Sequence, residues 1–352
     1  MSSVSRHWAP LFGFVLLAAP LARADDYRIS GPYTQENLSI FLIHSPRNEA
    51  ATKLLTLQEA MEQKKVVVYE TGHVNELAIE NLSSENVYIQ SGDIVKGGQQ
   101  DRVFPTDFML TSHSGRVPIA SFCVERGRWS KRGVEPEKQF SASQLRAPKM
   151  VVMAARDKKD QAEVWNEVSK AQDGLARTAQ RADRAGSGVG SGSGAGIGPG
   201  VANSYSPVMA STSMQLALES KPVVDATNAY VQNLSKIVDG DTDVVGFAYA
   251  INGKVNSAEL YSSSDLFRRM WPKLLQSSAA EALTERGKTS APPPDIPAVQ
   301  KTLADAEGGR ESSTEVKGHM SVSKRDSDKM ILFETRAKDL DDSWLHRSYV
   351  VK

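Results

Sequence analysis

The sequence predicts an α+β fold, a β-rich single large domain with several helices and a disordered Gly/Ser-rich insertion. Short runs of apolar or alternating residues, typical of strands, dominate the chain before residue 186 and return after residue 240. Apolar residues at helical spacing lie on both sides of a glycine-rich stretch. No repeat of solenoid or propeller length is present, so strands and helices are mixed along the chain as in α+β proteins.

The strands expected before the glycine-rich stretch are short and rich in β-branched or alternating residues. They cover residues 38–43, 66–69, 76–81, 86–90 and 116–125. Thr56 and Glu59 form the T-x-x-E pattern of a capping box, which predicts a short helix over 56–64. An apolar stripe inside a charged segment predicts a second helix over about 158–184.

The second part of the chain is expected to begin with a helix and a hairpin. An apolar stripe predicts the helix over 223–237. Asn252-Gly253 then suits the positive φ angles of a type I′ turn, so the flanking runs 244–250 and 254–261 are expected to form a hairpin.

The remaining elements lie after this hairpin. Ser264 is expected to cap a helix that contains Pro272, where a kink or a restart is expected. A short helix over 298–304 precedes three strands. Those strands are expected at 317–323, 329–335 and 345–351.

Two segments are expected to lie outside the fold. Residues 1–24 have a positive start, a short apolar run and an A-x-A site, the pattern of a secretory signal peptide. The mature chain would begin at Asp25, without a transmembrane segment, and be exported to the periplasm or the extracellular space. Residues 186–213 are expected to form a flexible insertion within one domain, whose two parts are 25–185 and 214–352.

Composition excludes several function classes. The chain has 42 Lys+Arg and 42 Asp+Glu, and this balance argues against nucleic-acid binding, which needs a basic excess. A single cysteine excludes an intrachain disulfide and a cysteine-based zinc site. The six histidines never occur at ligand spacing, and no nucleophile elbow, P-loop or dinucleotide fingerprint is found. We therefore expect neither a metal nor a cofactor, and we expect the mature protein's histidines at the surface or at strand ends.

The densest group of unusual residues lies between residues 90 and 132. It can bind a carboxylate, phosphate or sugar, because arginine binds anions as a fork, glutamine binds hydroxyls and tryptophan stacks. The candidate ligand-binding residues are Gln100, Asp101, Arg102, Glu125, Arg128 and Trp129. The positions expected to shape the backbone and its packing are Gly97, Gly98, Cys123 and Gly127.

The same residues have a structural alternative. Asp101 could form an ion pair with Arg126 or Arg128 that holds two strands together, and Trp129 could belong to the core. Cys123 lies in a strand without an activating motif, so we expect a buried and inert thiol.

Four segments together resemble the ARG-and-rhodanese-phosphatase-superfamily-associated protein domain family. They are 91–103 (SGDIVKGGQQDRV), 122–129 (FCVERGRW), 162–168 (AEVWNEV) and 244–283, which carries the Asn-Gly hairpin. The resemblance implies that the glycine-rich stretch is an insertion in one family domain. It implies no reaction. It does imply which residues occupy the motif positions: Gly98, Gln100, Arg102, Cys123, Glu125, Gly127, Arg128 and Trp129.

We therefore expect a non-catalytic binding module for a small polar or anionic ligand. A first alternative is a structural or interaction protein of the envelope, with an envelope protein as its partner. A second alternative is a hydrolase of small anionic or glycosidic substrates, in which Glu125 would act as acid or base. Whether the protein is an enzyme stays open at this point.

Overall fold

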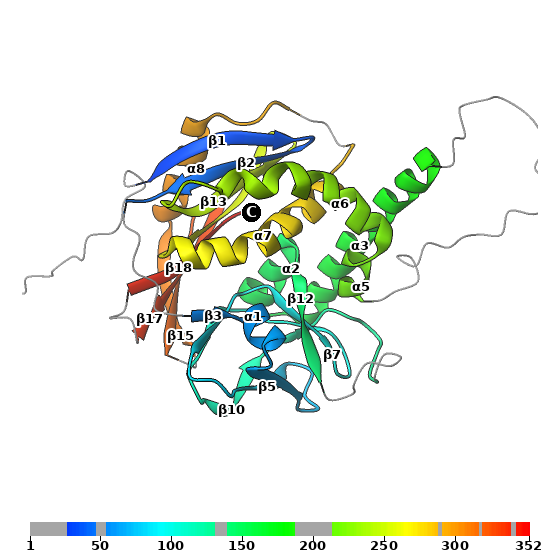
Figure 1. The fold of residues 1–352 in the computed structure, drawn as a ribbon, viewed down its shortest axis with the longest axis vertical. Helices are drawn as coiled ribbons and strands as arrows, with labels where there is room; N and C mark the ends of the chain where they lie inside the picture. Colours follow the sequence, from blue (N-terminus) through cyan, green and yellow to red (C-terminus); the bar gives the residue numbers. More distant parts are fainter. Residues whose placement is uncertain are drawn as a thin grey trace, which may run out of the picture.

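The computed structural model describes residues 27–46, 54–130, 139–186, 213–287, 291–316, 319–338 and 343–352. The expected signal peptide and residues 187–212 of the expected insertion lie outside these ranges. The described residues form a β-rich α+β fold, which confirms the predicted fold class (Figure 1).

An eight-stranded antiparallel sheet organises the molecule. Its strand order is β1-β2-β13-β14-β18-β17-β16-β15, so the N-terminal hairpin pairs with strands from the last third of the chain. The strands are β1 (Arg28–Gln35), β2 (Leu38–His44), β13 (Val244–Ile251), β14 (Lys254–Tyr261), β15 (Arg310–Val316), β16 (Met320–Asp326), β17 (Met330–Ala337) and β18 (Ser343–Val351).

Three small sheets come from the segment between residues 54 and 146, in the lower part of Figure 1. Their orders are β10-β5-β4, β11-β8-β7-β12 and β3-β6-β9. The strands are β3 (Leu54–Thr56), β4 (Val66–Glu70), β5 (Glu76–Asn81), β6 (Asn86–Ile89), β7 (Asp93–Gly97), β8 (Arg102–Val103), β9 (Phe108–Leu110), β10 (Gly115–Ala120), β11 (Phe122–Cys123) and β12 (Phe140–Arg146).

Helices cover both faces of the large sheet. On one face α3, α6 and α7 enclose the main core, in which Phe247 of β13 packs on Trp271 of α7. On the other face α8 buries Val299 and Leu303 against the sheet. The helical elements are α1 (Leu57–Glu62), α2 (Lys149–Met153), the π-helix η2 (Ala154–Lys158), α3 (Gln161–Gly186), α5 (Met214–Leu218), α6 (Lys221–Leu234), the 3-10 helix η3 (Ser235–Val238), α7 (Ser264–Thr284) and α8 (Ile296–Glu307).

Local sequence patterns correctly predict several of these elements. Both hydrogen bonds of the predicted capping box form: the Glu59 N–H donates to the Thr56 hydroxyl, and the Thr56 N–H donates to the Glu59 carboxylate. Asn252 and Gly253 both have positive φ and join β13 to β14 as expected. The cap of α7 is Ser263 rather than Ser264, and α7 continues through Pro272 without a restart.

Other boundaries differ from the expectation. The strand expected over 116–125 is two strands, β10 and β11, which pair with different partners. The strands expected at 317–323 and 329–335 are β16 and β17, and β15 before them was missed. In the described ranges no helix is long and apolar enough to cross a membrane.

Candidate functional site

The two motif segments lie on neighbouring strands. β8 pairs with β7 and with β11, and Cys123 lies opposite Arg102 in this register. Gly97 and Gly98 turn the chain after β7, both at positive φ. A Cβ atom on Gly98 would lie 2.3 Å from the ring of Phe140, so the turn has room only for glycine. The structure therefore brings the two predicted groups of residues together.

Arg128 joins these segments through buried acids. Its Nε donates to Glu125 Oε2 at 2.6 Å, and its Nη2 lies 3.4 Å from Asp101 Oδ1. The same guanidinium donates to the carbonyls of Gly97 and Gly98. Both acids are buried, and such an arrangement matches the structural alternative, an ion pair that holds two strands together. We call the ion pairs and hydrogen bonds that Arg128 makes with Glu125, Asp101, Gly97 and Gly98 the Arg128 clamp.

Asp101 extends this clamp to a distant segment. Its Oδ1 accepts from the backbone N–H of Gly97 at 2.9 Å, and its Oδ2 accepts from Ser213 Oγ at 2.7 Å. The backbone N–H of Met214 also donates to the carbonyl of Val124. The clamp therefore fastens the start of the chain's second part to the motif strands.

Arg102 is 0 % exposed and only partly satisfied. Its Nη1 donates to Gln100 Oε1 at 3.1 Å, and Glu70 Oε1 lies 3.7 Å from its Nη2. Its Nε and Nη2 have no hydrogen-bond partner among the described residues. Burial lowers the pKa of this guanidinium.

Trp129 is the part of the cluster that faces solvent. It is 47 % exposed, so the expectation that it could be a core residue is wrong. The Arg102 guanidinium carbon lies 5.9 Å from the centre of its ring, within the range of a cation–π contact. Trp129 thus offers a flat apolar surface beside a buried positive charge.

Cys123 and Gln100 complete the interior of the cluster. Gln100 Nε2 and Cys123 Sγ both donate to the carbonyl of Glu125, at 3.0 and 2.9 Å. Gln161 of α3 exchanges two hydrogen bonds with the backbone of Cys123. Burial raises the pKa of the buried thiol, as expected for an inert cysteine.

A second polar centre, which sequence analysis missed, lies between the large sheet and the small sheets. His346 Nδ1 lies 2.7 Å from Asp107 Oδ2, and its Nε2 lies 2.8 Å from Glu259 Oε2. Ionised carboxylates only accept hydrogen bonds, so this arrangement favours the imidazolium form, in which both ring nitrogens donate. Although burial opposes a charged ring, the two carboxylates outweigh it and raise the pKa of His346. The expectation of a surface or strand-end position is wrong for His346, which is fully buried within β18.

Two further ion pairs belong to this centre. Arg146 of β12 pairs with Glu259, and Lys273 Nζ of α7 lies 2.8 Å from Asp93 Oδ1. Several of these charged residues sit within or beside apolar strand sequences, such as Glu259 in SAELY and His346 in WLHRSYVV. A charged residue inside an apolar strand could have predicted this centre, because a buried charge needs a buried partner of opposite sign.

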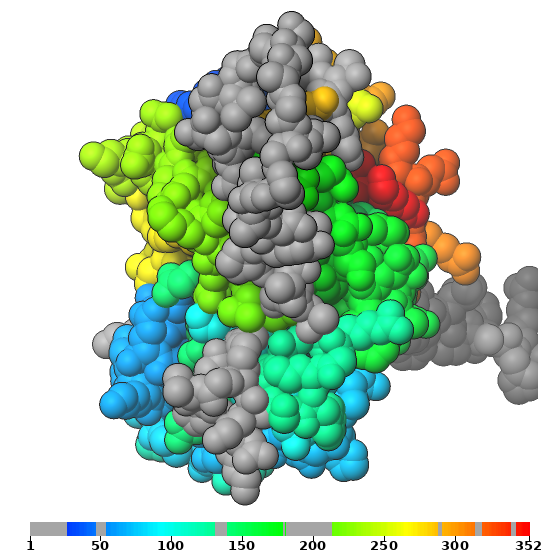
Figure 2. All heavy atoms as spheres, turned by 90° about the vertical axis from the view of Figure 1, so that its right-hand side faces the viewer, coloured from blue at the N-terminus to red at the C-terminus, as the bar shows by residue number. Residues whose placement is uncertain are grey.

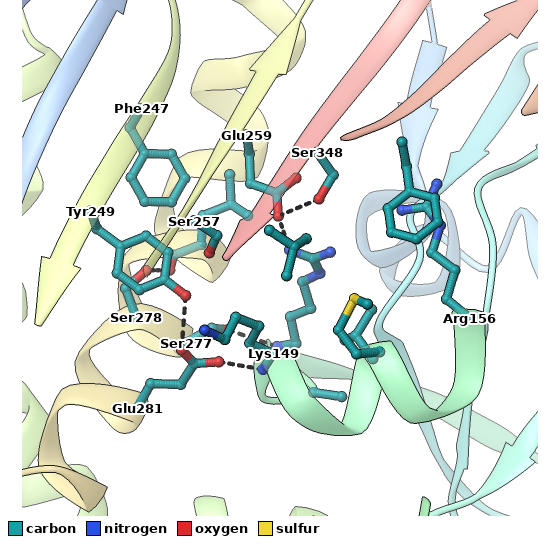
Figure 3. Close-up of a pocket in the computed structure, with 17 residues that line it drawn as sticks. Lys149, Arg156, Phe247, Tyr249, Ser257, Glu259, Ser277, Ser278, Glu281 and Ser348 are labelled. Carbon is teal, nitrogen blue, oxygen red and sulfur yellow. Dashed lines mark hydrogen bonds and ion pairs between the residues drawn. The ribbon is translucent and has the colours of Figure 1, made fainter. Parts of the chain in front are cut away.

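A small cavity adjoins the second centre. Its volume is about 30 Å³, and Arg146, Arg156 and Glu259 contribute to its wall. Figure 3 shows Glu259 and Ser348 entering from two strands and Arg156 entering from the helical segment opposite them. The cavity can hold about one or two water-sized groups.

A larger groove lies next to this cavity. Its volume is about 760 Å³, and residues of α2, α3, α7, the β13–β14 hairpin and the end of the chain line it. Figure 2 shows α3, in green, beside the C-terminal strand, in red, on this face of the molecule. Lys149 and Glu281 line both the groove and the cavity. None of the predicted site residues lines either of them.

The fold and these sites define a β-rich α+β protein with a polar groove and an interior rich in paired charges. The chain belongs to the ARG and Rhodanese-Phosphatase-superfamily-associated Protein domain family, whose sequence model matches residues 26–350. This match confirms the expected resemblance. No curated protein matches the chain, and no solved structure does.

Proposed function

We propose that the protein is an exported, non-catalytic binding module and that its ligand, a small organic anion, occupies the groove. The observation that carries the proposal is the set of unpaired groups along the groove wall. The groove's volume of about 760 Å³ lies within the range of small-molecule sites.

Cations predominate among the unpaired groups of the groove. Arg177 of α3 and Lys254 of the hairpin are exposed, and neither has an ion-pair or hydrogen-bond partner among the described residues. The acids at the wall already have partners. Glu167 accepts from Lys170 at 2.6 Å, and Glu281 accepts from Tyr249 and Asn256. The groove wall carries five basic and three acidic side chains in all, so its net charge attracts an anion.

Asn256 adds a second requirement for the ligand. Its Oδ1 atom is buried at the groove and lacks a hydrogen-bond partner in the described part of the chain. A buried acceptor left unsatisfied costs about 1–3 kcal/mol, so a ligand that donates to it gains affinity. The favoured ligand class is a small anion that also carries an O–H or N–H donor, such as a hydroxy acid or a sugar phosphate.

The motif cluster supports binding less directly than the groove does. Glu125, the candidate acid or base, already accepts from Arg128 and from the backbone N–H of Asp101. Arg128 likewise donates to the carbonyl oxygens of Gly97 and Gly98. We propose that this cluster maintains the fold beneath an exposed Trp129 and that Glu125 has no role in a reaction.

Thermal shift with a ligand panel tests the proposal. Hydroxy acids and sugar phosphates are compared at constant ionic strength, with glucose as the uncharged control. We expect a dose-dependent rise of Tm for at least one anion, because a ligand that binds only the native state stabilises it. The double variant Arg177→Glu/Lys254→Glu should lose that rise, whereas Lys301→Glu, at an exposed lysine on α8, should keep it. Equal Tm shifts in all three proteins would contradict the groove as the site.

Export is the second part of the proposal, and residues 1–24 support it by their signal-peptide pattern. The protein is expressed with its full sequence, and the intact mass of the exported fraction is measured. We expect a chain that begins at Asp25. A full-length chain retained in the cytoplasm would contradict export.

A further inference from the structure

Arg156 is a buried cation that has no ion-pair partner among the described residues. It lies on η2 and is 6 % exposed. Its Nε and Nη2 atoms have no hydrogen-bond partner among the described residues. Its guanidinium carbon lies 4.0 Å from the centre of the Phe333 ring. Burial lowers the pKa of Arg156, which reflects how unfavourable the uncompensated charge is at this position.

The neighbouring acids are already engaged by other cations. Glu259 pairs with Arg146 and His346, and Asp93 pairs with Lys273. Asp107 accepts from His346, from Thr335 at 2.6 Å and from the backbone N–H of Ser91 at 2.8 Å. With His346 as an imidazolium, His346, Arg146, Lys273 and Arg156 carry four positive charges against the three negative charges of Asp93, Asp107 and Glu259. Arg156 is the cation of this set that has no carboxylate partner among the described residues.

The cavity beside Arg156 has room for the missing charge. Its volume of about 30 Å³ exceeds what one water needs but is too small for a sugar or a hydroxy acid. Three basic and two acidic side chains line the cavity beside apolar residues such as Val152 and Phe333, so the charged part of the wall carries a net positive charge. Enclosure strengthens the attraction between a guanidinium and an anion, because it excludes bulk water.

We propose that this cavity binds one small monovalent inorganic anion, of the halide or nitrate class, against Nε and Nη2 of Arg156. The local backbone supports a specialised role, since π-helical turns occur frequently at functional sites. The anion would neutralise the charge of Arg156, whose guanidinium joins η2 to β17 by its contact with the Phe333 ring. This site is separate from the groove, although Lys149 and Glu281 line both.

Bromide identifies such a site directly by its anomalous scattering. Crystals of the wild-type mature protein are soaked in sodium bromide. We expect an anomalous peak in the cavity, within hydrogen-bond distance of the Arg156 guanidinium. A cavity with no peak, or with peaks only at the protein surface, would overturn the proposal.

A solution measurement tests the same site without crystals. Chloride replaces a bulky sulfonate at constant ionic strength while Tm is recorded. We expect the Tm of the wild type to rise and then saturate with chloride. Arg156→Met should lose this saturating rise, and Arg126→Met, at an exposed arginine, should keep it. A rise that is absent from the wild type, or unchanged in a folded Arg156→Met protein, would contradict the proposal.

The groove variants separate this proposal from the proposed function. Arg177→Glu/Lys254→Glu should bind no organic anion yet retain the chloride effect and the bromide peak. If this double variant also loses the chloride effect, the anion lies in the groove and not at Arg156.

Discussion

Arg128 illustrates how one side chain of the motif supports the fold. Its guanidinium contacts Glu125, Asp101 and the carbonyls of the Gly97–Gly98 turn. Removal of this partner leaves two carboxylates buried without a counter-charge, which typically costs about 3–5 kcal/mol.

We therefore expect Arg128→Leu to lower the free energy of unfolding in urea by about 3–5 kcal/mol. Arg126→Leu, two residues away and exposed, is the control and should lower it by about 1 kcal/mol or less, because it removes only a cation–π contact with Trp165. If the two variants were equally stable, the clamp at Arg128 would have no structural importance.

Cys123 lies in the interior of the same cluster. The thiol is buried, burial raises its pKa, and it donates to the carbonyl of Glu125. We expect a soluble thiol reagent at pH 8 to leave the native protein unlabelled and to modify one thiol per chain after unfolding in urea. Rapid labelling of the native protein would show that the thiol is accessible.

The sequence predicted the residues of the motif cluster but not the groove or the second polar centre. Gln100, Arg102 and Glu125 stood out because unusual polar residues were close together in sequence. Arg177 and Lys254 are ordinary surface cations in sequence, and only the packing of α3 beside the hairpin makes them neighbours in the groove. His346 and Asp107 meet across 239 residues of chain, which no local pattern reveals.

The turn after β7 is the element whose sequence is most constrained. Gly98 has a φ of 52°, and an added Cβ would lie 2.3 Å from the Phe140 ring and 2.8 Å from Glu70. Gly127 has a φ of 90°, but an added Cβ there meets nothing within 4 Å. The two positions therefore separate backbone strain from steric overlap.

We expect Gly127→Ala to destabilise the protein by about 1–2 kcal/mol, the cost of a left-handed backbone for a residue with a Cβ. Gly98→Ala should lose about 1–3 kcal/mol more, because overpacking adds to this strain. Urea unfolding of both variants measures the difference. Equal losses would mean that Phe140 moves aside freely.

Elements with local signals were predicted better than elements that depend on distant partners. The capping box at Thr56 and the Asn252-Gly253 turn are complete within a few residues, so their outcome follows from local chemistry. β1 was missed because RISGPYTQ contains little apolar alternation, and its place depends on pairing with β2. The order of the large sheet joins β2 to β13 across about 200 residues, beyond any periodic pattern.

For the whole molecule, the buried charges predict a dependence of stability on pH. The pKa values of Asp107 and Glu259 lie below their usual range in the folded state: burial opposes this shift, and pairing with His346 and Arg146 outweighs it. Stability from these acids is present above about pH 4 and is lost as the pH falls. The raised pKa of His346 acts in the opposite direction, so its contribution is lost as the pH rises above about 6.5.

We therefore expect the free energy of unfolding to be highest between about pH 4.5 and 6.5. Above this window it should fall by about 1.4 kcal/mol per pH unit until His346 loses its proton in the folded state. Urea unfolding from pH 4 to 9 measures the profile, and His346→Gln should remove the alkaline slope. A slope that persists in this variant would assign the effect to other groups.

We propose for the whole molecule that the groove binds the ligand and that the motif cluster supports the fold. Amide chemical-shift mapping of residues 25–352, titrated with the anion that raises Tm most, tests this assignment. We expect saturable shifts at Arg177 and at Asn252 to Asn256. Shifts confined to Gln100 to Arg102 and Trp129, or an absence of saturable shifts, would contradict it.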